Sequence, residues 1–155
     1  MASIFGHALV SVALGTSFYK KLKTTKFWLL GIACAIIPDA DVIGFNYGIK
    51  YDSFWGHRGF THSFMFALLF SLLITLLFYR KQFLSKKGML FILFFFLCTA
   101  SHPILDAMTS GGKGVAFFSP FNDARYFFPF RPIKVSPLGI MRFFRSRRYI
   151  DRAFR

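Results

Sequence analysis

Residues 57–63 read His-Arg-Gly-Phe-Thr-His-Ser, and this polar stretch separates two strongly apolar halves of the chain. It holds two of the four histidines. Three further polar pieces lie in or beside the apolar runs: His7, Pro-Asp-Ala-Asp at 38–41, and His-Pro-Ile-Leu-Asp at 102–106. We interpret the four pieces as parts of one metal site, held by a small bundle of membrane helices.

The composition is that of a membrane protein. The 155 residues are 55% hydrophobic and include 24 Phe, which is too apolar for an ordinary soluble domain. The 20 Lys and Arg outnumber six acidic residues, all of them Asp, and the net charge is +14. This charge flanks the apolar runs, a pattern typical of contact with anionic lipid headgroups. We therefore expect membrane lipids as partners and no specific nucleic acid, and the sequence leaves the oligomeric state open.

Four apolar runs predict four helices. They cover residues 3–19, 27–37, 64–79 and 88–105. The expected fold class is all-α: an integral membrane four-helix bundle with an interfacial, partly irregular and basic C-terminal segment. The expected domains are a transmembrane helical domain at residues 1–108, which carries the metal site, and an interfacial loop with a basic tail at residues 109–155.

The second run has eleven residues, so at 1.5 Å per residue it covers about half of a hydrocarbon core of roughly 30 Å. Either its helix continues through Asp39 and Asp41, or it stops within the membrane. Both alternatives place carboxylates near membrane depth, where they need a cation or hydrogen-bond donors. Residues 45–56 are expected to form a loop, and Thr61 or Ser63 is expected to cap the third helix.

Clusters of basic residues follow the first and third runs and predict the orientation. They consist of Lys20, Lys21, Lys23 and Lys26, and of Arg80, Lys81, Lys86 and Lys87. Basic residues in short turns favour the cytoplasmic side. Four antiparallel helices then place all four histidines at the opposite end of the bundle. We therefore expect the site to face away from the cytoplasm.

The C-terminal part of the chain contains no clean span. Over residues 117–132 aromatic side chains mix with Pro, Asn, Asp and Arg, as in an interfacial loop. The segment 125–134 is expected either to cover the site or only to anchor the protein at the membrane interface. Over residues 142–155 arginines alternate with Phe and Ile, which predicts either a basic amphipathic helix on a membrane surface or a frayed basic tail.

Imidazole and carboxylate groups are ordinary ligands of zinc and other divalent ions. His102 and Asp106 are four residues apart, so on a helix they share one face. The candidate metal ligands are His7, Asp39, His62, His102 and Asp106. Taken singly, each residue could instead have a structural role, as part of a polar pair at the surface or as a histidine that is hydrogen-bonded within the protein. Together they favour one or two divalent ions, with Zn²⁺ as the first choice, because a cation satisfies several polar groups beside hydrocarbon at once.

Three further residues are candidates for catalytic roles. Asp41 or His57 is expected to accept a proton from a metal-activated water. Arg58 is a candidate to clamp a phosphate oxygen, although an arginine in a loop is more often a solvated charge.

At these residues the chain resembles the YdjM-like family of membrane-bound proteins, which are classed as metal-dependent hydrolases. The matching pieces are residues 6–7, 38–41, 57–63, 101–106, 109–112 and 118–121. The resemblance covers roughly residues 1–140. It implies a location in the bacterial plasma (inner) membrane.

That family is distantly similar to the zinc-dependent phospholipase C and S1/P1 nuclease group. By this resemblance the main site would consist of Asp39, His62, His102 and Asp106. His7 with Asp106 would help to hold a second ion. The chain has no Glu and so lacks the H-x-x-x-E pair that binds a further zinc in that group, and Val42 stands where many family members have a histidine.

These expectations describe a phospholipase C-like, membrane-bound hydrolase. It would use metal-activated water on a phosphoester of a lipid or lipid-linked substrate. The ligand set contains no Cys, so the ion stays Lewis-acidic and suited to phosphoryl oxygen. The alternative is a non-catalytic metal-binding membrane scaffold or transporter. Polar groups gathered at one end of the bundle argue against a pore through it.

Overall fold

The computed structural model describes residues 2–18 and 20–134, which form an all-α fold. Four α-helices are joined by 3₁₀ helices (η) and irregular turns. In chain order the elements are α1 (Ile4–Thr16), η1 (Lys20–Leu22), α2 (Thr25–Ile36), η2 (Ile37–Tyr47), η3 (Phe60–His62), α3 (Phe64–Phe78), η4 (Arg80–Gln82) and α4 (Lys86–Ala107). Extended pairing within these ranges is limited to two isolated bridges, Thr109 with Ile133 and Val115 with Tyr126. The all-α prediction is confirmed.

Each α-helix begins after a serine or threonine that accepts a hydrogen bond from a backbone N–H three residues later. These caps are Ser3, Thr24, Ser63 and Ser85. They satisfy donors that the first helical turn leaves free, and so they set where the helices begin. Of the two predicted caps of the third helix, Ser63 is the cap, and Thr61 bonds to Asp41 instead.

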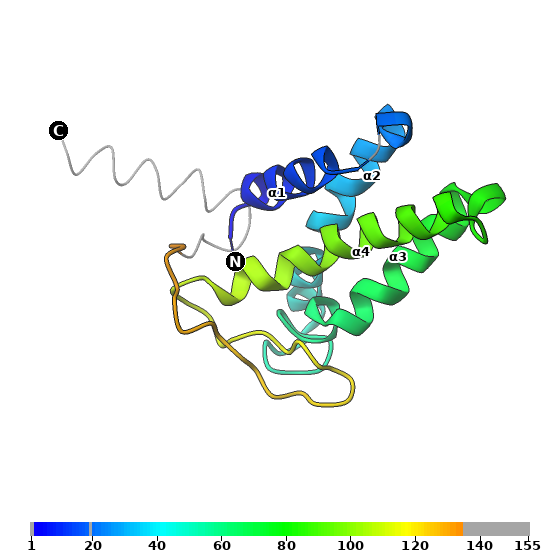
Figure 1. The fold of residues 1–155 in the computed structure, drawn as a ribbon. Helices are drawn as coiled ribbons and strands as arrows, with labels where there is room; N and C mark the ends of the chain where they lie inside the picture. Colours follow the sequence, from blue (N-terminus) through cyan, green and yellow to red (C-terminus); the bar gives the residue numbers. More distant parts are fainter. Residues whose placement is uncertain (1, 19, 135–155) are drawn as a thin grey trace.

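Helix α4 lies at the centre of the bundle and packs against α1, α2 and α3 (Figure 1). Phe27 of α2 and Phe94 of α4 stack with their ring centroids 3.9 Å apart. Gly31 lies beside this pair, where an added Cβ would come within 2.6 Å of the Phe94 ring. The core of the bundle therefore combines stacked aromatic rings with a small residue that lets two helices approach closely, as is common where membrane helices pack.

Among the described residues, two helical segments are long and apolar enough to cross a membrane: Thr25–Tyr47, which joins α2 to η2, and Lys86–Ala107. Helices α1 and α3 are apolar but have 13 and 15 residues. At 1.5 Å per residue they extend for about 20 and 22 Å. The predicted bundle of four helices is thus confirmed, and two of these helices are shorter than a full span. All four carry exposed apolar side chains, among them Leu9, Leu29, Leu77 and Met89.

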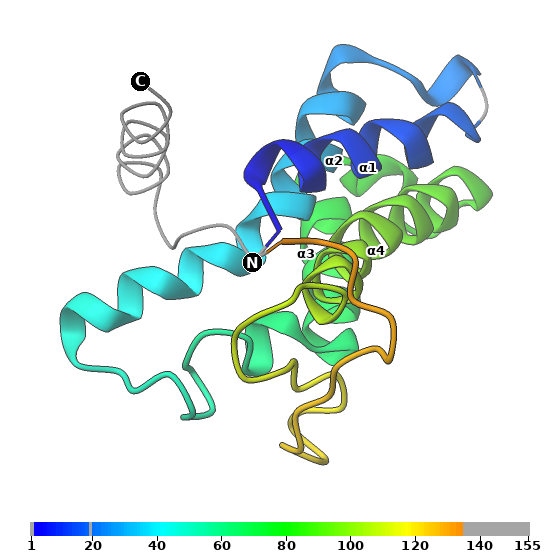
Figure 2. The same ribbon diagram turned by 90° about the vertical axis from the view of Figure 1, so that its left-hand side faces the viewer.

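The helix of the second apolar run continues past Pro38 as η2 and ends before Gly48, which has a left-handed φ of 77°. The structure therefore selects the alternative in which the helix runs through both aspartates. The expectation of a loop at 45–56 was wrong for residues 45–47, which are helical. A 3₁₀ helix of eleven residues is unusual, because runs beyond about four residues are uncommon. Figure 2 shows η2 projecting from the four α-helices before the chain turns back.

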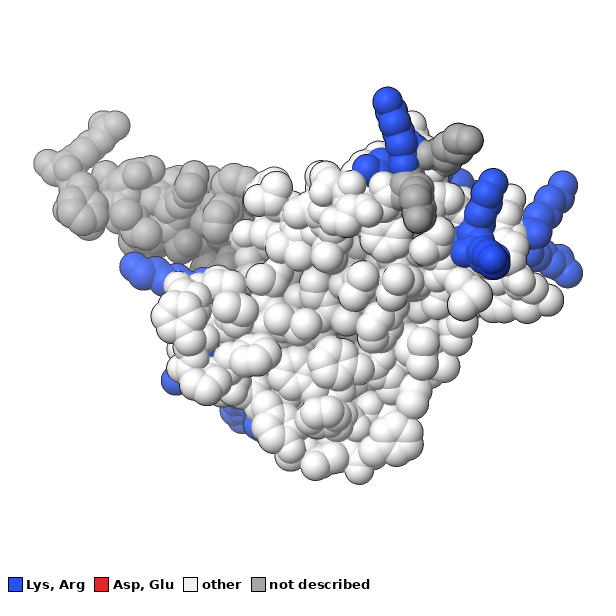
Figure 3. Space-filling model, viewed as in Figure 1, with Lys and Arg blue, Asp and Glu red and all other residues white. Residues whose placement is uncertain are grey.

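The two basic turns lie at the same end of the bundle, as predicted. The Lys26 ammonium group, at the start of α2, donates to the Phe78 carbonyl oxygen at the end of α3. It also lies over the rings of Phe78 and Tyr79. Figure 3 shows Lys and Arg side chains gathered over the α1–α2 and α3–α4 turns. One end of the bundle is therefore strongly basic.

Residues 109–134 pack at the opposite end. The Ala116 N–H donates to the Arg58 carbonyl oxygen, so this segment is tied to the loop that precedes η3. It is largely irregular, as predicted. The predicted tail at 142–155 lies outside the described residues.

Candidate metal centre

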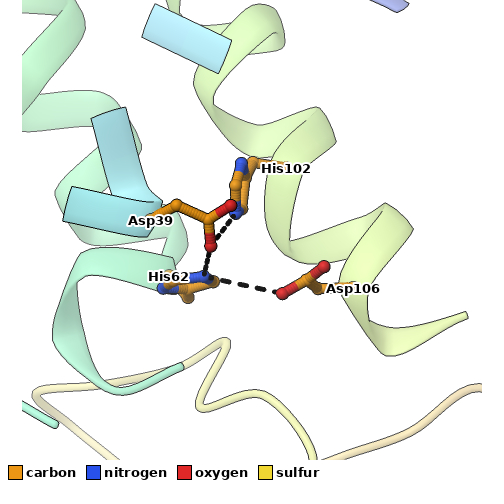
Figure 4. Close-up of side chains that lie close together, drawn as sticks. All are labelled: Asp39, His62, His102 and Asp106. Atoms are coloured by element: carbon orange, nitrogen blue, oxygen red, sulfur yellow. Dashed lines mark ion pairs between the residues drawn. The ribbon is translucent and has the colours of Figure 1, made fainter. Parts of the chain in front are cut away.

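Four side chains from three separate elements meet at the end of the bundle away from the basic turns (Figure 4). Asp39 comes from η2 and His62 from η3, while His102 and Asp106 lie on successive turns of α4. His102 Nε2 is 3.2 Å from Asp39 Oδ1. His62 Nε2 is 3.8 Å from the same oxygen and 3.7 Å from Asp106 Oδ2. One ligand atom of each residue lies within 4.8 Å of all the others, so the four could share one ion.

The 3₁₀ geometry of η2 lets both of its aspartates reach one histidine. Residues two apart diverge by about 120° at 3.0 residues per turn, but by about 160° in an α-helix. Asp39 faces His62 Nε2, and Asp41 Oδ2 lies 3.2 Å from His62 Nδ1. His62 therefore lies between two carboxylates that an α-helix would place on nearly opposite faces.

The rings of His62 and His102 are held so that Nε2 of each faces the cluster. His102 Nδ1 lies 2.6 Å from the Ala35 carbonyl oxygen, which can only accept, so this nitrogen carries the hydrogen. His62 Nδ1 is paired with Asp41 in the same way. In metal centres a ligand histidine commonly donates its other ring N–H to a carbonyl or carboxylate group. Both rings therefore have the arrangement of metal ligands.

His7 joins the cluster from α1. Its ring stacks on His102 with the centroids 3.7 Å apart, and its Nε2 lies 3.7 Å from Asp106 Oδ1. The Asp106 carboxylate also accepts hydrogen bonds from the Ala2 N–H and from Arg58 Nε–H. One carboxylate thus ties together the N-terminal segment, the loop before η3, and α4. All five predicted metal ligands lie in one buried cluster.

Most polar atoms of this cluster have no hydrogen-bond partner within the described part of the chain. These atoms are His7 Nδ1 and Nε2, both Asp39 oxygens, and Nε2 of His62 and His102. An unpaired buried polar group costs about 1–3 kcal/mol. A divalent cation would satisfy several of these atoms together, so the donor set fits a metal ion.

The carboxylates give the cluster an excess of negative charge. Burial lowers the pKa of His62, but the neighbouring carboxylates of Asp39, Asp41 and Asp106 outweigh burial and raise that pKa to about 9. The charge balance therefore draws a cation to this position, either a proton on His62 or a metal ion.

Asp41 and His57 form an adjoining pair. His57 Nδ1 lies 2.7 Å from Asp41 Oδ1, while Asp41 Oδ2 accepts from the Thr61 hydroxyl and the Arg58 backbone N–H. Both Asp41 oxygens therefore accept hydrogen bonds, whereas His57 Nε2 has no partner in residues 2–18 and 20–134. Burial lowers the pKa of His57 despite the neighbouring carboxylate, so the ring is neutral near pH 7. Of the two expected proton acceptors, this geometry favours His57.

Arg58 has a different role from the expected one. Its side chain is buried, and its backbone has a left-handed φ of 64°. The guanidinium group donates to Asp106 Oδ2, Thr109 Oγ1 and the Gly111 carbonyl oxygen. Gly112 permits this packing, since an added Cβ there would lie 2.5 Å from Arg58 Nη1. Arg58 therefore positions Asp106 inside the protein and is not free to clamp a phosphate.

Sequence reasoning missed the residues that hold the site loop in place. No contact of Thr109 was predicted, although a polar residue shortly after a long apolar helix was an available signal. Arg125 donates to the carbonyl oxygens of His57 and Tyr51, at 2.9 and 3.2 Å, and its guanidinium group lies over the Tyr51 ring. The start of the expected covering segment thus contacts the loop that carries His57.

Comparisons with known proteins agree with a membrane location. A family model described as "YdjM inner membrane protein" matches residues 1–153. The chain is 38% identical over 144 residues to "Inner membrane protein YbcI" of Escherichia coli (strain K12), an alignment that covers 92% of this chain and 82% of that protein. No solved structure matches. Both descriptions name the inner membrane, and neither names an activity.

Proposed function

Because the chain belongs to the YdjM family of inner membrane proteins, we propose that its Asp and His cluster binds a divalent metal ion and hydrolyses a phosphoester at the membrane. One observation carries this proposal. The unpaired Nε2 atoms of His62 and His102 converge with the unpaired carboxylate of Asp39. Asp106 closes the group, 3.7 Å from His62.

Zn²⁺ is the metal that this donor set favours. Two imidazoles and two carboxylates provide four nitrogen and oxygen donors, and four is the usual number for zinc. Asp41, His57 and His62 form a second group with ligand atoms within the same 4.8 Å limit. His7, beside Asp106, adds a further donor. The arrangement is therefore compatible with one or two ions.

A bound divalent ion supplies Lewis acidity, which lowers the pKa of water and offsets charge on a phosphoryl group. The chain itself orients groups and moves protons. Asp41 holds His57 Nδ1 and leaves Nε2 free to accept a proton from the attacking water. Thr61 in turn holds Asp41, and Arg58 holds Asp106. Burial of these groups excludes bulk water, which strengthens their electrostatic interactions.

The proposed substrate is a phosphoester of a lipid or lipid-linked molecule. The cluster lies at one end of a bundle of apolar helices, where we expect the headgroups of the bilayer. The loops at this end expose the aromatic side chains of Trp55, Phe121 and Phe130. Such rings are typical of the membrane–water interface. Arg125 adds positive charge beside His57.

We further propose that the site faces away from the cytoplasm. The two basic turns lie at the other end of the bundle, and basic turns favour the cytoplasmic side. A topology reporter inserted beside Asp52 should be active only outside the cytoplasm. Activity only inside it would reverse the orientation.

A non-catalytic metal-binding scaffold is the second candidate, and the burial of the cluster favours it. His62, His102 and Asp106 are fully buried, and Asp39 is 6% exposed. Structural zinc sites have a closed ligand set, whereas catalytic sites keep a position open for water or substrate.

Metal analysis and hydrolysis assays of the purified full chain in detergent separate the two candidates. We expect stoichiometric zinc and cleavage of phospholipids or polyprenyl phosphates, weaker cleavage of a soluble phosphodiester, and no cleavage of a peptide. Cleavage of the peptide alone would refute the phosphoester assignment. Stoichiometric zinc without turnover of any substrate would favour the scaffold.

A further inference from the structure

A groove between α3 and α4 lies beside the metal cluster and takes no part in the chemistry described so far. It has a volume of about 650 Å³ and is lined by three residues of α3, four of α4 and four of the segment 117–121. Ten of these eleven residues are Phe, Met, Leu or Ile. The other is Ser119, which is buried and donates its hydroxyl hydrogen to Asp123. The groove therefore offers its occupant an almost purely apolar surface.

The groove adjoins the metal cluster through Phe64, which lines it two residues after His62. The Phe64 N–H donates to the Phe117 carbonyl oxygen at 3.0 Å, and the two rings stack with centroids 5.3 Å apart. Phe64 also packs against the group that contains Ala107, the neighbour in sequence of Asp106. This part of the groove is thus lined and backed by residues that lie next to His62 and Asp106 in the chain.

We propose that the groove binds one acyl chain of a phospholipid whose headgroup phosphate lies at the metal cluster. This inference rests on the proposed function, for which it names the substrate class. Leu68 and Leu93 line the groove and are 42% and 47% exposed. In an inner membrane protein these exposed apolar faces meet bilayer hydrocarbon, so an acyl chain enters the groove without crossing water.

A helix of a second copy fits the groove less well than an acyl chain. A helix about 10 Å across occupies roughly 400 Å³ per turn, so the groove would hold only about one and a half turns. An acyl chain is narrower and bends to follow the walls. Two of the lining residues, Met65 and Met89, are flexible and adapt to such a chain.

The test uses the full chain in phospholipid vesicles that contain a trace of phospholipid with a diazirine in the middle of one acyl chain. After illumination, labelled residues are mapped by mass spectrometry. Labels should concentrate on the groove residues of α3 and α4. Leu68→Trp or Leu93→Trp should fill the groove and lower this labelling by about tenfold, which corresponds to about 1.4 kcal/mol. Leu69→Trp is the matched control, because Leu69 is exposed on the same turn but does not line the groove.

Hydrolysis of the same phospholipid and of a soluble phosphodiester is measured on each variant. Loss of phospholipid turnover in Leu68→Trp, with soluble turnover retained, supports the acyl-chain site. Equal labelling of the Leu68→Trp and Leu69→Trp proteins overturns it, whatever the activity. Groove labelling in a protein that hydrolyses neither compound leaves the acyl-chain site standing and refutes the hydrolase.

Discussion

Helix α4 contributes to two buried regions of opposite chemistry, an aromatic core and the metal cluster. Phe94, Phe95 and Cys98 are as fully buried as His102 and Asp106 on the same helix. In the aromatic core each apolar surface meets another apolar surface, and burial itself is stabilising. In the cluster most polar atoms have no hydrogen-bond partner among the described residues. Equal burial therefore stabilises the aromatic core but costs free energy in the cluster. A cation that binds the cluster would offset this cost.

Removal of two cluster ligands should have the largest effect. In the double variant His62→Ala/His102→Ala, zinc affinity should fall by more than about 100-fold, since loss of an outer partner alone costs about 10–100-fold. Inductively coupled plasma mass spectrometry of the purified protein measures this. Asp52→Ala is the control, because Asp52 is exposed and paired with Lys113. Stoichiometric metal in the double variant would mean that the ligands are misassigned.

Loss of the free imidazole nitrogen beside the cluster should affect rate more than metal content. His57→Gln should lower phosphoester hydrolysis by about 10²–10⁴-fold, because it removes the proton acceptor. Initial rates at saturating substrate are compared at equal zinc content. Unchanged turnover in the His57→Gln protein would assign the proton transfer to another group.

A cavity in the aromatic core should destabilise the bundle without changing the metal site. Phe94→Ala should lower the free energy of unfolding by about 3–5 kcal/mol, because it removes a stacked, fully buried ring. Denaturation in detergent measures this, and Leu29→Ala on the exposed face of α2 is the control. The folded fraction should keep its zinc. Loss of zinc from folded Phe94→Ala protein would show that the aromatic core and the metal cluster are energetically coupled. It would contradict the claim that the two regions are independent.

Two helix caps, one at each end of the bundle, offer the finest comparison. Ser85→Ala and Ser63→Ala should each cost about 1 kcal/mol of stability, because each removes an equivalent capping bond. Ser63 follows His62, so its loss should also weaken zinc binding a few-fold, while Ser85→Ala should not. Thermal denaturation and competition with a zinc chelator measure both quantities. Equal zinc affinity in the two variants would show that the cap does not position His62.

The gathering of the histidines at one end could be predicted because it depends only on the number of helix crossings, in either orientation. The end point of the second helix could not, since the apolar run stops at Ile37 while the helix continues to Tyr47. Local hydrophobicity does not predict η2, because its carboxylates pair with histidines that lie far away in the sequence. The burial of Arg58 was missed for the same reason, because its partners Asp106 and Thr109 lie 48 and 51 residues away.

The sequence by itself determined the all-α fold, the approximate extent of the four helices and the residue types of the metal cluster. These properties follow from local features, namely apolar run length, capping residues and charge beside the runs. The tertiary structure alone decided which ring nitrogens face the cluster, because the Ala35 carbonyl that orients His102 lies 67 positions away. It also decided that the guanidinium of Arg58 serves Asp106 and that α3 and α4 enclose an apolar groove. Such contacts join distant parts of the chain, so they exist only after the helices have packed.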